Sequence, residues 1–152
     1  MKKQYNNLNI ENLIKTNWFK KFNQRQQEQI TFGLLSNVDV LIYAKKEFDY
    51  KQMEEIRLGL ENNLDVSVYA KKEFNGCQMN EIRKGLKDNL DVSTYVNPKL
   101  KAAQMEQIRW SLKANLDVLV YAKPEISWQE MREIRLKLLK EKLGSSYSPS
   151  LL

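Results

Sequence analysis

The chain has 152 residues, with 25 Lys or Arg, 19 Asp or Glu, one Cys and no His, and its net charge is +6. Its length suits one domain or one short array of repeats, and 42% hydrophobic with 29% charged residues is typical of a folded protein rather than a disordered one. No apolar run approaches the roughly 18 residues of a membrane span, residues 1–22 lack a signal-peptide core, and a lone cysteine excludes an internal disulfide, so we expect a cytoplasmic protein with no membrane contact.

A repeat of 26 residues dominates the chain. The unit reads roughly Q-M-x-E-I-R-x-G-L-x-x-N-L-D-V-x-x-Y-A-x-x-x-F. Its period is carried by Asp39, Asp65, Asp91 and Asp117, and by Tyr43, Tyr69, Tyr95 and Tyr121. The copies occupy residues 23–48, 49–74, 75–100 and 101–126, and they predict an all-α, helical-repeat solenoid in which each unit has a long helix and a short one.

Residues 1–22 are predicted to form an N-terminal cap helix that covers the first copy. The amphipathic segment runs over residues 9–22. Its apolar face is made of Ile10, Leu13, Ile14, Trp18 and Phe22.

Each copy begins its long helix with a capping-box spacing, in which a polar N-cap precedes Gln or Glu by three residues. The N-caps are Asn23, Asp49, Asn75 and Ser127, and Lys101 is a poor cap in the fourth copy. Four asparagines are placed to end these helices in the left-handed conformation, followed by Val or Leu. They are Asn37, Asn63, Asn89 and Asn115.

The short second element has two interpretations. Asp65 can cap a helix over residues 66–70, but Val66 and Val68 would also suit a strand. A strand would give an α/β solenoid, which is the alternative fold. The recurring Asp cap favours the helix.

The last unit differs from the others. Residues 127–144 are predicted to form a C-terminal cap helix, which gains Lys137, Lys140 and Lys142 and stops at Gly144. Residues 145–152 are predicted to be a flexible tail.

Without His, the commonest general base and metal ligand are absent, so we expect no enzyme, no metal and no cofactor. A position two residues after the repeated Ile points away from the core face of the long helix. It holds Phe32, Leu58, Lys84, Trp110 and Leu136. These side chains either pack on neighbouring units or form a partner-binding stripe anchored by the aromatic residues.

Basic residues suggest a second type of contact. Repeated arginines form a ladder that either binds phosphates or an acidic partner, or pairs with structural acids, for example Arg57 with Glu61 or Asp65. The basic candidates are Lys2, Lys3, Lys20, Lys21, Arg57, Arg83, Arg109 and Arg135.

The Gln-Met-x-Glu-Ile-Arg-x-Gly-Leu motif followed by Leu-Asp-Val-x-x-Tyr-Ala resembles a repeat of uncharacterised proteins from bacterial plasmids, conjugative elements and phages. The resemblance covers about residues 22–138. It carries no known reaction. It implies a mobile-element context, in which small binding proteins inhibit host defence nucleases such as restriction or CRISPR enzymes.

Two functions therefore follow as hypotheses. The first is a non-enzymatic module that binds another protein, with a host defence nuclease (as in anti-CRISPR proteins) as the partner that the resemblance implies. The alternative is a nucleic-acid-binding protein that uses its basic caps and the arginine ladder. Residues 1–22 carry +4 and residues 127–152 carry +2, whereas residues 23–126 are neutral, which favours the first hypothesis.

Overall fold

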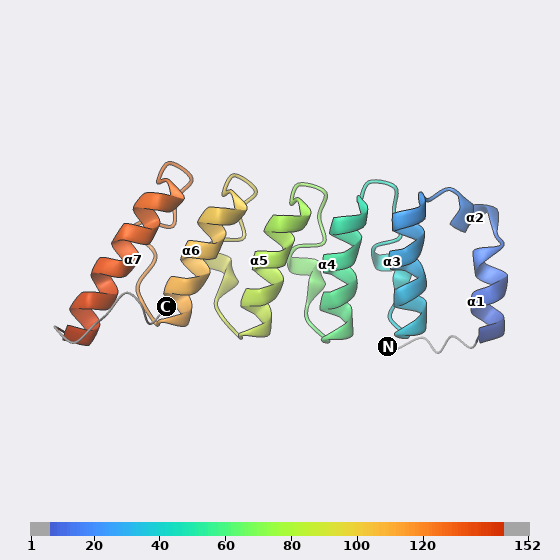
Figure 1. Cartoon of the computed structure of the whole chain (residues 1–152), viewed down its shortest axis with the longest axis horizontal. Coiled ribbons are helices and arrows are strands. Elements are labelled where there is room, and N and C mark those ends of the chain that lie inside the picture. The colour runs from blue at the N-terminus through green and yellow to red at the C-terminus, as the bar shows by residue number, and fades with distance from the viewer. Residues whose placement is uncertain (1–6, 145–152) are drawn as a thin grey trace. The chain divides into compact units, whose positions relative to one another are not determined.

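The computed structural model describes residues 7–144, and every regular element in that range is helical (Figure 1). The elements are α1 (Asn7–Ile14), α2 (Asn17–Lys20), α3 (Gln24–Leu35), η1 (Val40–Ile42), α4 (Tyr50–Glu61), η2 (Val66–Val68), α5 (Gly76–Lys87), η3 (Val92–Thr94), α6 (Ala102–Lys113) and α7 (Trp128–Leu143). The chain divides within α5 into two compact units, one up to Arg83 and one from Lys84 onward. In the first unit α3 packs beside α4, and in the second α6 packs beside α7.

The N-terminal cap is two helices, so the prediction of one continuous helix over residues 9–22 was wrong. The Thr16 side chain breaks it: its hydroxyl donates to the Leu13 carbonyl at 2.6 Å and accepts from the Phe19 N–H at 3.3 Å. Thr16 thereby closes α1 and caps α2. The apolar cover is still present, since Ile10, Phe19 and Phe22 are buried.

The ends of the long helices confirm the predicted caps. Reciprocal capping boxes join Asn23 to Gln26 and Asp49 to Gln52, and the same pattern starts α5 and α7. At the other end, four asparagines have φ of 55–56°. Leu64 N–H donates to the Gly59 carbonyl at 2.9 Å, which closes a Schellman motif after α4.

The second element of the copies is a single 3-10 turn, capped by the repeated aspartate. Asp65, for example, accepts the Ser67 N–H at 3.1 Å. No strand occurs between residues 7 and 144, so the α/β alternative has no support there. The fourth copy has turns at this place without a regular helix.

A buried tyrosine fixes the 3-10 turn to its long helix in the first two copies. The Tyr43 hydroxyl donates to the Gln29 carbonyl and the Tyr69 hydroxyl to the Glu55 carbonyl, each at 2.8 Å. A Cβ atom at Gly59 would overlap the Tyr69 hydroxyl, so the mid-helix glycine makes room for the ring.

Repeated glutamines connect one copy to the next. Gln26 Nε2 donates to the Phe48 carbonyl at 2.8 Å and Gln52 Nε2 to the Phe74 carbonyl at 2.6 Å. In the second unit, Gln104 Nε2 donates to the Ile126 carbonyl at 2.6 Å. The same side chains accept the N-cap N–H groups, so one residue caps its own helix and holds the next loop.

Within residues 7–144, no helix combines the length and the apolar character needed to cross a bilayer. The predicted tail at 145–152 lies outside the described residues.

Candidate partner-binding positions

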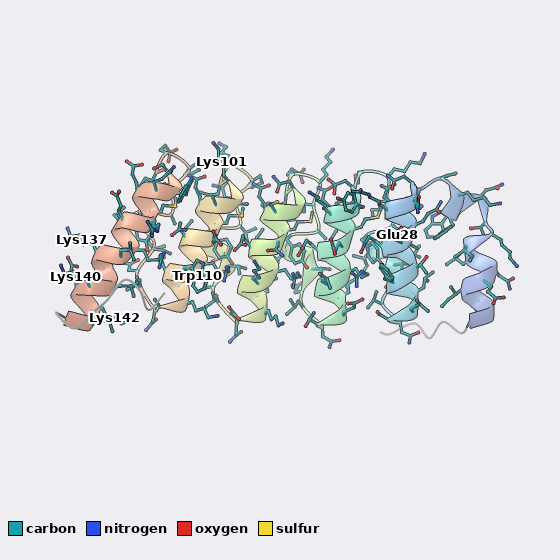
Figure 2. All side chains as sticks on the ribbon, in the orientation of Figure 1. Glu28, Lys101, Trp110, Lys137, Lys140 and Lys142 are labelled. Carbon is teal, nitrogen blue, oxygen red and sulfur yellow. The ribbon has the colours of Figure 1, made fainter. Side chains whose placement is uncertain are left out.

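The five predicted contact residues occupy the same position on α3, α4, α5, α6 and α7, but they differ in exposure. Phe32 is 47% exposed and Trp110 is 41% exposed, whereas Leu58, Lys84 and Leu136 are partly buried. Figure 2 shows Trp110 on α6. Each compact unit therefore presents one exposed aromatic at this position: Phe32 in the first and Trp110 in the second.

Cations cover one side of both exposed rings. The Arg57 guanidinium lies 5.5 Å from the centre of the Phe32 ring, and the Arg109 guanidinium lies 5.1 Å from the Trp110 ring. Lys113 Nζ is 5.9 Å from the same indole. Cation–π contacts of this kind hold an aromatic side chain in place while leaving other parts of the ring open.

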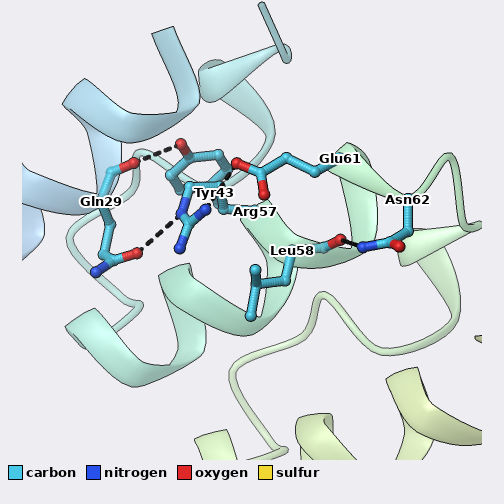
Figure 3. Close-up of polar contacts among 6 residues, drawn as sticks. All are labelled: Gln29, Tyr43, Arg57, Leu58, Glu61 and Asn62. Carbon is cyan, nitrogen blue, oxygen red and sulfur yellow. Dashed lines mark hydrogen bonds and ion pairs between the residues drawn. The ribbon is translucent and has the colours of Figure 1, made fainter. Parts of the chain in front are cut away.

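The arginine ladder joins neighbouring helices (Figure 3). Arg57 Nε donates to Gln29 Oε1 at 3.0 Å on α3, and its NH1 pairs with Glu61 at 2.7 Å. Arg83 Nε pairs with Glu55 Oε2, also at 2.7 Å. The predicted pairing of Arg57 with Glu61 is thus confirmed.

The same arrangement recurs in the second unit, where Arg135 donates to Gln107 Oε1 at 3.2 and 3.3 Å. Arg109 and Arg135 are buried, and the side chains of Arg57 and Arg83 are only 12% and 13% exposed. The ladder leaves little guanidinium surface for phosphates, in line with its structural interpretation.

The other basic candidates divide by position. Lys20 and Lys21 are exposed at the end of α2, whereas Lys2 and Lys3 lie outside the described residues.

A groove of about 310 Å³ runs beside Phe32, between the cap helices and α3. Ile14, Phe19 and Phe32 supply its apolar walls, and Gln24, Gln27, Glu28 and Thr31 its polar ones. Gln27 and Thr31 are engaged with backbone carbonyls at 2.8 Å. Figure 2 shows Glu28 on α3, one helical turn before Phe32. The groove can accept an apolar side chain with a polar neighbour.

Sequence reasoning missed several exposed apolar residues. Leu41 is 54% exposed and Leu119 is 71% exposed, at a position where the middle copies have Ser67 and Ser93. Since the serines occupy the same position in the fold, the leucines are not needed there for folding. That difference between copies is a signal in the sequence itself.

No cluster of His, Cys, Asp or Glu within residues 7–144 is arranged to hold a metal ion. No protein-family model, curated protein or solved structure matches the chain. The function therefore has to be inferred from the chain's own side chains.

Proposed function

We propose that this protein is a non-enzymatic helical-repeat module that binds another protein. The carrying observation is the pair of exposed aromatics, Phe32 and Trp110, at a position whose other members are partly buried. Exposed aromatic side chains cost solubility and are enriched at the energetic centres of protein interfaces. The groove beside Phe32 supplies a concave surface next to one of them.

We further propose that the copies stack as a solenoid. The support for this proposal comes from contacts within each compact unit, where the hydrogen bonds of the glutamines and arginines recur at the same separation in sequence. Gln26 and Gln52 reach the carbonyl 22 residues later, and Arg57 and Arg83 reach the side chain 28 residues earlier. Repeated nearest-neighbour contacts of this kind build helical-repeat arrays.

The experiment compares immobilised wild type with a Phe32→Ala/Trp110→Ala variant in lysates of bacterial hosts, with bound proteins quantified by mass spectrometry. The control is Leu35→Ala, which removes an apolar side chain that is 59% exposed on α3. We expect a protein retained by wild type and by Leu35→Ala, and lost from the double variant. Equal retention by all three would overturn the assignment of the site.

From the sequence resemblance, we also propose that the protein partner is a host defence nuclease. It predicts that the retained protein is a nuclease and that adding the purified chain lowers its cleavage rate. A retained protein without nuclease activity would remove this part while leaving the binding module intact.

Nucleic-acid binding is the second candidate, and one observation favours it. Residues 84–144 contain 12 Lys or Arg and 8 Asp or Glu, whereas residues 7–83 contain 11 of each. A phosphate contact would therefore be expected in the second unit. It predicts a mobility shift of duplex DNA that weakens steeply with salt, and a shift that does not respond to salt would exclude it.

A further inference from the structure

The loops that lead into α6 and α7 border a half-open surface cavity of about 390 Å³ in the second unit, and most of its lining residues are exposed. We call it the junction cavity. Its lining residues are Lys99, Lys101, Gln104, Pro124, Glu125, Ser127, Trp128 and Gln129. Gln104 Nε2 donates to the Pro124 carbonyl at 3.0 Å and to the Ile126 carbonyl at 2.6 Å, so one buried side chain ties both walls together.

Two lysines in this cavity stand where other copies have acidic or neutral side chains. The position of Lys99 is occupied by Glu47, Glu73 and Glu125 in other copies, and by Lys21 before the first copy. The position of Lys101 is occupied by Asn23, Asp49, Asn75 and Ser127. Only this junction brings two cations to these positions.

Lys101 is also an unfavourable N-cap and lowers the stability of the helix that it starts, α6. Its ammonium cannot accept a helix N–H, and a cation at the N-cap opposes the helix dipole. Because the sister copies use Asn, Asp or Ser there, the fold does not require a lysine. A residue that disfavours its own helix and is not needed by the fold is a candidate for a role outside folding.

The cavity wall adds a flat ring and a carboxylate. Trp128 is 40% exposed, at a position that holds Gln24, Tyr50, Gly76 and Ala102 in the other copies. An exposed indole is a stacking surface for a planar ring. Glu125 can accept hydrogen bonds from sugar hydroxyls, as acidic residues do in dinucleotide sites.

We propose that the junction cavity binds a nucleotide, with its phosphate at Lys99 and Lys101, its base on Trp128 and its sugar hydroxyls toward Glu125. The volume lies in the range of small-molecule sites. Two ammonium groups against one carboxylate leave the cavity positive, which suits a phosphate monoester. This site is independent of Phe32 and Trp110, so its failure would leave the proposed function intact.

The test uses the full chain and nitrogen-15 NMR of the indole N–H groups, with the Trp128 signal assigned by Trp128→Phe. The probes are adenosine monophosphate, inorganic phosphate, adenosine and a 5′-phosphorylated trinucleotide. We expect the monophosphate to shift the Trp128 signal more than those of Trp18 and Trp110, and to bind about tenfold more tightly than phosphate or adenosine alone. A trinucleotide that binds more tightly still assigns the ligand to a strand end, and equal affinity assigns it to free nucleotides.

The key variant is Lys99→Glu/Lys101→Asn, which introduces the pair Glu73 and Asn75 found where the second copy meets the third. It should weaken binding of the monophosphate at least about tenfold, without lowering the midpoint of thermal unfolding because asparagine is a good N-cap. Lys137→Glu/Lys140→Asn makes the same charge change on α7, away from the cavity, and should keep the affinity within about twofold. No Trp128 shift at about 10 mM monophosphate, or equal affinity in the two variants, would overturn the proposal.

Discussion

The repeated tyrosine hydroxyl has a hydrogen-bond acceptor in two copies and lacks one in the fourth. Tyr43 and Tyr69 donate to helix carbonyls, but the corresponding carbonyl of Gln107 accepts the Ser111 hydroxyl at 2.9 Å instead. No residue in the described range makes a hydrogen bond to the buried Tyr121 hydroxyl. Burial raises the pKa of Tyr121. Ser111, which stands where the first three copies have glycine, thus occupies the carbonyl that accepts the tyrosine hydroxyl in the first two copies.

Removing the two hydroxyls should therefore have different effects. We expect Tyr69→Phe to lower the free energy of unfolding by about 1–2 kcal/mol, because a buried bond is lost. Tyr121→Phe should leave it unchanged or raise it, since a polar group without a partner is removed. Urea denaturation of both variants checks this. Equal destabilisation would show that the Tyr121 hydroxyl does have a partner.

The mid-helix glycine gives a second prediction at single-residue scale. Alanine normally stabilises a helix by about 1 kcal/mol relative to glycine. At Gly59 its Cβ would meet the Tyr69 hydroxyl and lie 2.7 Å from Val66 Cγ1. We expect Gly59→Ala to destabilise by about 2 kcal/mol, as overpacked cores do. Ser111→Ala is the matched control, because that position already accommodates a Cβ, and it should change stability by less than half as much.

The exposure of the candidate contact residues shows what sequence can supply at this scale. Helix geometry correctly pointed Phe32 and Trp110 away from the main core. It could not show that Arg57 covers Phe32, because that arginine belongs to the next copy, 25 positions away, and its direction depends on Gln29 and Glu61. Side-chain contacts between copies are set by packing rather than by spacing along one helix.

At the scale of helices, the glutamine of the capping box uses both atoms of its side-chain amide. The oxygen accepts the N-cap N–H, and the nitrogen donates to a carbonyl of the next loop. In α7 the equivalent residue is Glu130, whose carboxylate accepts from the Ser127 N–H at 2.9 Å and from its hydroxyl at 2.7 Å. A carboxylate suffices there because it serves only as an acceptor. The difference between glutamine and glutamate at this position thus reflects whether an amide donor is needed.

Exchanging the two residue types tests this. Gln52→Glu removes the donor to the Phe74 carbonyl and turns a buried carboxylate toward it, so we expect a loss of about 3 kcal/mol in unfolding free energy. Acid should reduce that loss, since a protonated carboxyl donates again. Glu130→Gln is the control and should change the melting temperature much less. Equal losses would contradict the role of the amide donor.

The start of α7 has a pH-dependent cap. Hydrogen bonds from the Ser127 hydroxyl, and then from its backbone N–H, hold the pKa of Glu130 below its ordinary value. A lowered folded-state pKa stabilises the fold above the unfolded-state pKa, and that stabilisation is lost as pH falls through the folded-state value. We expect Ser127→Ala to raise the pKa of Glu130 toward the ordinary value, measured by NMR titration of its carboxyl carbon. An unchanged pKa would mean that the backbone N–H alone holds it.

The N-terminal cap shows why the boundaries of helices are difficult to predict from the sequence. The apolar positions from Ile10 to Phe22 keep a helical period across the break between α1 and α2, so periodicity alone predicts one continuous helix. The break depends on one hydroxyl, that of Thr16, bonding in both directions. Threonine is common inside helices as well as at their starts, and the sequence pattern does not separate the two uses.

For the molecule as a whole, the repeat made the helical content predictable. Capping boxes, left-handed asparagines and the short second element all depend on residues within one copy, and the structure confirms them. The junction cavity and the tyrosine–glycine contact were not predicted. Both require residues from separate segments to meet in space, and only the comparison of one copy with another hints at them.

The hydrogen bond from each repeated glutamine to the next loop also determines which deletions the fold can tolerate. Donor and acceptor both belong to the 26-residue period, so removing one whole period leaves no glutamine without its carbonyl. Deleting residues 49–74 would bring Arg83 to the place of Arg57, opposite Gln29. We expect this deletion to retain helical circular dichroism and cooperative melting, whereas deleting residues 49–61, which removes α4 alone, should destabilise the first unit and lower its melting temperature. Gain or loss of whole periods would then change the length of the chain without leaving these hydrogen-bonding groups unpaired.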